Sequence, residues 1–235
     1  MVPGSNPGGF TYFKMEQSFS RKLEVPVVFQ PEGTKYCGPA GLSMIFKYYG
    51  LNIPFEQIIK DLEVDTVGTY APQLGLYLIK HGFDIEIITL HPTLFTKNDY
   101  LMNQEEILLR IEDLFNKTKL EQNKKTLNYF IEFLKSGGKI KVKIPSKEDI
   151  IEEIKYNRPI TALMTTNFLN YNEPKFNFHF NVITGIDNEF VYVNDPWPDN
   201  TNGKKKHKIN EFFYGIYASA YADLDNACLI KIKKN

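Results

Sequence analysis

The sequence predicts an α+β fold, in which helices come first and a largely antiparallel sheet follows. Two observations predict it. Apolar residues recur at helical spacing through much of residues 37–156. After them come short β-rich runs separated by turn residues, namely RPITALMTT, FHFNVITGID, EFVYVND and NACLIKIK. Helices followed by runs of strands are typical of α+β domains.

The elements can be assigned in chain order. Residues 25–29 are β-branched and apolar and predict a strand, which a polar turn over 30–35 ends. Pro39 and Gly50 then bound a helix, because proline suits a first helical turn and glycine the position after the last one. The remaining predictions are helices at 54–63, 70–81, 103–117, 121–136, 147–156 and 209–217, and a strand at 83–90.

Changes in composition along the chain predict its domain organisation. Residues 1–20 are rich in Gly, Pro, Ser and Asn and predict a flexible lead-in or a cloning remnant. Residues 21–235 predict a single domain. Within it, residues 98–145 carry two Glu-, Lys- and Leu-rich predicted helices, which we interpret as an inserted helical hairpin.

Composition excludes several classes of protein. The 28 basic and 28 acidic residues give zero formal net charge, which disfavours a nucleic-acid partner and attraction to anionic membranes. No apolar run approaches the ~20 residues of a membrane span, and the N-terminus lacks the features of a secretory signal. The two cysteines form no CxxC pair, so we expect no disulfide framework, no metal and no cofactor. A cytoplasmic location is expected, with the oligomeric state open.

Cys37 is the candidate nucleophile. It lies where the predicted helix begins, and unsatisfied N–H groups at a helix start favour a thiolate. The alternative is a small buried residue at a helix start. Cys228 serves as the comparison, because it lies inside the apolar run ACLIKIK and is expected in the core.

His179 is the candidate base. The other histidines have structural explanations: His81 ends a predicted helix, His91 lies in a loop before a proline, and His207 lies in KKKHK, a predicted solvated turn. His179 instead stands among apolar residues at the head of a predicted central strand, where both ring nitrogens need partners. A satisfied core histidine is the alternative.

Asp195 and Gln30 complete the candidate set. A tight turn at residues 187–188 would join two antiparallel strands and place Asp195 across from His179, eight residues on either side. A turn-starting role before proline is the alternative for Asp195. Gln30 ends the predicted strand seven residues before Cys37, where its amide can donate to an oxyanion together with the Cys37 N–H.

These residues resemble a known family. The segment from Gln30 through CGPAGLSMIFKYYG resembles the nucleophile helix of papain-like cysteine peptidases of the bacteriocin-processing type, family C-thirty-nine. HFNVITGIDNEFVYVNDPW is similar to that family's histidine-and-aspartate hairpin, and EEIKYNRPITALM to the segment that leads into its sheet. The resemblance implies a papain-like fold and a thiol peptidase, with Cys37 as nucleophile, His179 as base and Asp195 as the residue that orients it. It places Gln30 at the oxyanion hole.

The chain also departs from the family's best-known members. Those are fused to a membrane ABC transporter and cut leader peptides after a double glycine, whereas this sequence shows neither a span nor a nucleotide motif. It looks closer to the stand-alone C-thirty-nine-like proteins, so only a peptide or protein substrate is expected. Three alternatives stay open: an acyl transferase or ligase with the same thiol, a non-catalytic peptide-binding module, and a zinc site.

Overall fold

The computed structural model of the chain describes residues 19–170 and 173–235. Most of the predicted lead-in lies outside the described residues. Up to residue 155 the elements are β1 (Arg21–Lys22), α1 (Cys37–Tyr48), α2 (Phe55–Leu62), α3 (Ala71–Lys80), β2 (Phe83–Thr89), the 3₁₀ helix η1 (Lys97–Leu101), α4 (Gln104–Lys117), α5 (Glu121–Lys135), β3 (Lys139–Val142) and α6 (Lys147–Lys155).

The later elements are β4 (Ile160–Thr165), β5 (Phe178–Ile186), β6 (Phe190–Asn194), β7 (Lys204–Lys208), α7 (Ile209–Ser219) and β8 (Cys228–Lys234). All eight described strands join in one sheet, whose path runs β3-β2-β8-β4-β5-β6-β7 while β1 pairs with β5. Every pairing is antiparallel except that of β2 with β3. The predicted α+β class is therefore confirmed.

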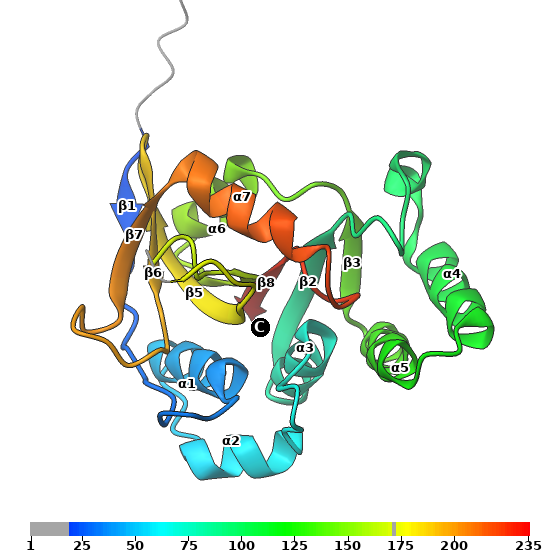
Figure 1. Cartoon of the computed structure of the whole chain (residues 1–235), viewed down its shortest axis with the longest axis horizontal. Coiled ribbons are helices and arrows are strands. Elements are labelled where there is room, and N and C mark those ends of the chain that lie inside the picture. Colours follow the sequence, from blue (N-terminus) through cyan, green and yellow to red (C-terminus); the bar gives the residue numbers. More distant parts are fainter. Residues whose placement is uncertain (1–18, 171–172) are drawn as a thin grey trace, which may run out of the picture.

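Helices cover both faces of this sheet (Figure 1). α1 packs against β5 and α3 against β2 on one face, while α6 and α7 cover the other, with α7 against β4. Strands buried on both faces are apolar almost throughout. Accordingly β4 is buried along its whole length and β5 at every residue but its first. Because α1 lies across β5, the start of that helix faces the head of that strand.

The helical hairpin of α4 and α5 lies at the β3 end of the molecule (Figure 1). Its two helices match the predicted ones, and α5 packs on α3. Asn103 caps α4 by accepting from the Glu106 N–H, and Glu106 in turn accepts from the Asn103 N–H. The sequence did not predict β3, which pairs parallel with β2 and extends the sheet beside the hairpin.

Two predictions were wrong. Residues 25–29 form no strand, because Pro26 has no N–H to donate and only isolated bonds hold the segment, such as the one that Val25 O accepts from Asn194 Nδ2 at 2.8 Å. The basic run KKKHK is not a turn but β7, which pairs along its length with β6.

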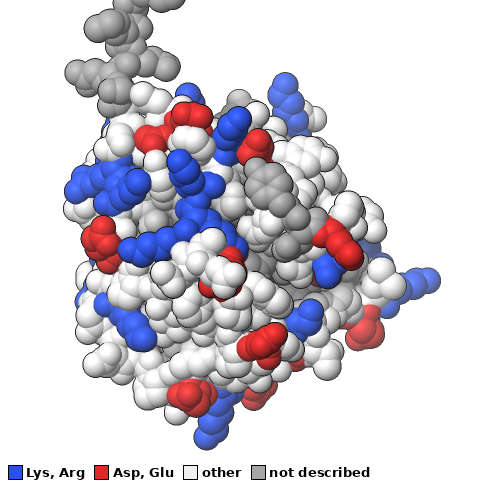
Figure 2. Space-filling model, turned by 60° about the vertical axis from the view of Figure 1, so that its left-hand side comes forward, with Lys and Arg blue, Asp and Glu red and all other residues white. Residues whose placement is uncertain are grey.

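Lysines protect the sheet edge that β7 forms. Lys204, Lys206 and Lys208 are exposed, while residues 205 and 207 point inward and are partly buried. Figure 2 shows basic side chains gathered on the side of the molecule that carries β1 and β7, which comes forward in that view. Charged side chains on an edge strand oppose pairing with another chain. Within the described residues, no helix is long and apolar enough to cross a membrane.

Candidate active site

Cys37 is the first residue of α1, as predicted, and its side chain is partly exposed. The first turn of α1 contains no acidic residue that would oppose a thiolate. Burial tends to raise the pKa of the thiol. The charge and hydrogen bond of His179, together with the backbone of Phe180 and Gly38, outweigh burial, so the pKa lies below its ordinary value. The helix start therefore holds a thiol that ionises readily.

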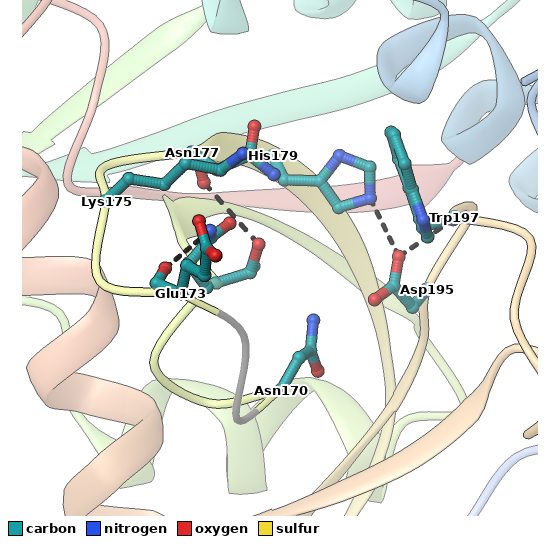
Figure 3. A pocket seen from close by; sticks show the side chains of 9 residues that line it. Asn170, Glu173, Lys175, Asn177, His179, Asp195 and Trp197 are labelled. Atoms are coloured by element: carbon teal, nitrogen blue, oxygen red, sulfur yellow. Dashed lines mark hydrogen bonds and ion pairs between the residues drawn. The ribbon is translucent and has the colours of Figure 1, made fainter. Parts of the chain in front are cut away.

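His179 is buried near the head of β5, and its Nε2 lies 2.7 Å from Asp195 Oδ1 (Figure 3). With Nε2 engaged, Nδ1 is the nitrogen left to face the Cys37 thiol. Burial tends to lower the pKa of His179, but the Cys37 thiolate and Asp195 together raise it to about 9. Since the pKa of Cys37 is lowered and that of His179 raised, a thiolate–imidazolium pair is favoured over two neutral groups.

Asp195 follows β6 and accepts bonds on both oxygens. Oδ1 accepts from His179 and from the Trp197 N–H at 2.9 Å, and Oδ2 lies 2.7 Å from Lys205 Nζ. Burial raises the pKa of Asp195, but His179 and then Lys205 lower it well below its usual range. The carboxylate is therefore fixed in orientation and charged.

The hairpin brings Asp195 to His179 by a diagonal contact rather than the directly opposite one we predicted. β5 and β6 pair Val182 with Asn194, and a bulge between residues 183 and 185 shifts the register. Extending that register places residue 195 opposite residue 181. Diagonal neighbours share a face of the sheet and lie within reach of long side chains. Asn194 points elsewhere, as predicted, and its side chain donates to Val25 O at 2.8 Å.

Gln30 is buried in the loop before α1. Its Nε2 donates to Thr34 O at 2.8 Å, and its backbone N–H donates to Pro196 O at 2.9 Å. Gln30 thus joins the loop before Cys37 to the loop after Asp195. Among the described residues, no hydrogen bond connects the Gln30 side chain to Cys37 or His179.

Sequence reasoning missed one neighbour of this set, the lysine at position 205. Lys205 on β7 contacts Asp195, and it also contacts Asp199 Oδ2 at 2.7 Å and Asn170 Oδ1 at 3.3 Å. The Trp197 ring meets that of His179 edge-on, with centroids 6.3 Å apart. The alternation of KKKHK as a strand is the signal that could have revealed Lys205.

A hollow of about 330 Å³ opens beside His179 and Asp195 (Figure 3). Figure 3 shows the His179 ring directed at Asp195 with Trp197 beside it, and Lys175 and Glu173 on the facing wall. Within residues 19–170 and 173–235, no three His, Cys, Asp or Glu side chains converge as metal ligands.

The remaining cysteine and two of the other histidines fit their structural explanations. Cys228 is buried in β8, where burial raises the pKa of its thiol well above the ordinary value. His81 follows α3, and its Nδ1 lies 2.7 Å from Tyr77 O. His91 is buried in its loop beside Thr93 Oγ1, at 2.8 Å.

Comparison with known proteins points in one direction. A model described as the Peptidase_C39 like family matches residues 22–224. A solved C-thirty-nine-like peptidase from Bacillus anthracis superposes with a TM-score of 0.54 at 14% identity, covering 92% of this chain and 98% of that chain, which shows a shared fold.

Two further solved structures superpose less closely on this chain. A double glycine motif protease from an AMS/PCAT transporter, in complex with the leader peptide, gives a TM-score of 0.48 at 18% identity over 91% of this chain and 94% of that chain. The peptidase domain of Streptococcus ComA, a bi-functional ABC transporter, gives a TM-score of 0.47 at 17% identity, covering 89% of this chain and 98% of that chain. No curated protein matches the sequence.

Proposed function

This chain belongs to the Peptidase_C39 like family and is a cysteine peptidase, and we propose that Cys37, His179 and Asp195 are its catalytic triad. The observation that carries the proposal is the 2.7 Å contact between His179 and Asp195, with a thiol of lowered pKa on the other side of the imidazole. A nucleophile, a base and a group that orients the base are the roles such a triad requires.

In the proposed reaction, the Cys37 thiolate attacks the carbonyl carbon of a peptide bond, and the C=O electron pair moves onto oxygen. His179 gives its Nδ1 proton to the leaving amine as the C–N bond breaks, which leaves a thioester on Cys37. Water then attacks the thioester and loses a proton to His179. The C–S bond breaks, releasing the acid and restoring the ion pair.

We place Gln30 at the oxyanion hole. Its amide nitrogen carries two hydrogens, of which Thr34 O accepts one, so the second is left for the substrate oxygen. The backbone N–H of Cys37 would be the other donor. The bonds of Gln30 to Thr34 and Pro196 support this role because they hold the loop at the start of α1 in place. One such donor contributes on the order of 10²–10³ in rate.

We propose a peptide or protein substrate, in keeping with a structural neighbour that was solved with a leader peptide. The same thioester could pass to an amine, and product analysis with and without added amine separates hydrolysis from transfer. The two free thiols suit a reducing compartment such as the cytoplasm. We also propose that residues 98–145 are an insertion, since the other seven strands already form a continuous sheet.

Thiol reactivity tests the proposal directly. Iodoacetamide at pH 7 should modify Cys37 at least about 100-fold faster than Cys228, because only Cys37 lies at a helix start beside an imidazolium. Peptide mass mapping reads both sites in one sample. Peptide cleavage should vanish in Cys37→Ala and persist in the matched variant Cys228→Ala. Equal modification of the two cysteines would contradict the proposal.

A further inference from the structure

A second hollow, of about 180 Å³, opens on the other side of Cys37. Cys37 lines it, whereas His179, Asp195 and Trp197 line only the first hollow. Asn177 lines both, so the two hollows meet there. Sites for drug-sized ligands measure roughly 300–1,000 Å³, so this one fits a single side chain.

The reaction decides which part of a substrate enters this hollow. His179 must protonate the leaving amine, so the leaving segment has to lie along the hollow that His179 lines. The acyl segment, which becomes bonded to Cys37, then extends to the opposite side. The second hollow is therefore placed to take a side chain from the acyl side of the scissile bond.

The charged wall of this hollow is acidic. Asp225 is 3% exposed, and its Oδ2 accepts the Ala71 N–H at 2.7 Å, where α3 begins. Asp223 lies in the same wall, and no Lys or Arg among the described residues forms an ion pair with either carboxyl. Lys35 lines the hollow but is exposed, and it forms no ion pair with any residue in 19–170 or 173–235.

The pKa of Asp225 shows that its charged form is unfavourable in this arrangement. Its burial, with a smaller contribution from Asp223, raises the pKa of Asp225 to about 7 even though the Ala71 N–H lowers it. A buried carboxyl without a cation is unfavourable. An incoming cation would remove that cost.

The other wall is aromatic. Phe176 is half exposed and stacks on Tyr221 with centroids 4.8 Å apart and on Phe178 at 6.0 Å. Phe180 lines the hollow deeper in the molecule. Long cationic side chains lay their alkyl stems along apolar surface, and aromatic faces attract the cation itself.

We propose that this hollow binds a lysine or arginine side chain on the acyl side of the scissile bond, an inference that rests on the proposed function. The stem lies along Phe176 and Phe178, and the charged end reaches Asp225 and Asp223. The peptidase would then select substrates with a basic residue shortly before the cleaved bond.

Peptidyl chloromethyl ketones test this, because they alkylate a catalytic thiol without needing turnover. One series carries lysine, arginine or uncharged norleucine at each of the three positions before the reactive ketone, and mass mapping gives the rate at Cys37. At one of the three positions, the reagents that carry lysine or arginine should react at least about tenfold faster than the one that carries norleucine. The reason is that hydrogen bonds between charged groups are stronger than those between neutral groups.

Variants locate the source of the preference. Asp225→Asn keeps an oxygen for the Ala71 N–H but loses the charge, so the ratio of basic to norleucine rates should fall toward one. Asp113→Asn, on the exposed surface of α4, is the matched control and should keep the ratio. If Asp225→Asn does not fold, Asp223→Asn should still lower the ratio.

Two results overturn the inference and are distinguishable. In the first, every reagent labels Cys37 quickly with no preference for a basic residue, or the preference survives in both variants. Either outcome contradicts the basic subsite but leaves the peptidase proposal intact. A Cys37 that no reagent labels faster than Cys228 removes both.

Discussion

Burial is the largest single influence on the pKa of the thiol and of the imidazole at this site. It raises the pKa of Cys37 and lowers that of His179, which would keep both groups neutral. The attraction between the two groups and the hydrogen bonds that each receives together reverse both directions. Asp195 adds to the effect on His179 from Nε2, the side away from the thiol. The ion pair should therefore persist until the pH passes the pKa of His179.

The alkaline limit of activity follows from this. In the proposed reaction His179 must carry its proton to protonate the leaving amine, so kcat/KM should fall as the pH rises through about 9. Asp195→Asn removes a carboxylate that raises the pKa of His179, so the fall should move to lower pH, and kcat/KM should drop on the order of 10²–10⁴-fold. A pH–rate profile measures both.

Asp84→Asn, at an exposed position of β2, is the control for that profile. It should leave the alkaline limit in place. An unchanged limit in Asp195→Asn would mean that the carboxylate does not act on the imidazole.

The sequence was informative about residues that lie at the ends of elements. Cys37 begins a helix marked by Pro39, and His179 and Asp195 lie on either side of a hairpin whose turn residues can be recognised. The register of this hairpin, which pairs Val182 with Asn194, had no sequence signal, and it makes the contact diagonal. The direction of the Gln30 amide depends on Thr34 O, a contact that a sequence pattern does not specify.

At the scale of elements, successive side chains of β7 point to opposite faces of the sheet, so similar residues lie in different environments. Its lysines are chemically alike, yet Lys206 is exposed at the sheet edge while Lys205 is about 10% exposed and contacts Asp195 and Asp199. Burial lowers the pKa of Lys205, but Asp195 and then Asp199 raise it above its ordinary value. This lysine supports the charge on Asp195.

Lys205→Met should therefore lower the free energy of unfolding by about 3 kcal/mol, because it leaves two carboxylates without their cation. Lys206→Met on the same strand should change it by no more than about 0.5 kcal/mol. Urea unfolding of both variants gives the comparison. Similar values for the two would show that the contacts of Lys205 contribute little.

The α4–α5 hairpin is part of the core even if residues 98–145 are an insertion. Phe133 on α5 is fully buried, and a Cβ at Gly75 of α3 would lie 2.6 Å from its ring. The two helices therefore approach closely, and only glycine fits at residue 75.

Phe133→Ala should lower the free energy of unfolding by about 3–5 kcal/mol, because it leaves a cavity between α3 and α5. Leu109→Ala, at an exposed position of α4, is the matched control and should cost less than about 1 kcal/mol. Denaturant unfolding measures both. A small effect of Phe133→Ala would mean that the hairpin is packed only loosely on the core.

The helices were predictable because each one carries its own periodicity and end signals, such as Ser146 before α6. Two extended segments were mispredicted because pairing decides them. Residues 139–142 become a strand only because β2 offers an edge, and residues 25–29 do not become one although their residues favour it. β-propensity describes a fit to neighbours, which the sequence does not supply.

At the scale of the whole molecule, zero net charge conceals an uneven distribution. Basic side chains gather on the side of β1 and β7 (Figure 2), while the hollow beside Cys37 is lined by two carboxyls that form no ion pair with any described Lys or Arg. The first long helix of the chain lies on its later strands, and this brings Asp225 into the same hollow as Cys37, which lies far earlier in the sequence. Composition alone predicted neither feature.

Asp225 should lower the stability of the free protein in a pH-dependent way. Its pKa is about 7 when folded, because of burial, against about 3.9 in an unfolded chain. Between these values the folded state holds a proton that the unfolded state has lost, so this group's contribution to stability falls as the pH rises from about 4 to about 7.

Asp225→Asn removes the titration and keeps an acceptor for the Ala71 N–H, so the variant should be more stable than the parent by about 4 kcal/mol at pH 8. Near pH 4 the difference should disappear. Urea unfolding at the two pH values measures it, with Asp113→Asn as the control that gains nothing at either pH. If Asp225→Asn is more stable at pH 8 and also loses the preference for basic side chains, the Asp225 carboxyl lowers the stability of the free protein and contributes to substrate selection. Equal stability of variant and parent at pH 8 would show that the Asp225 charge is already compensated in the free protein.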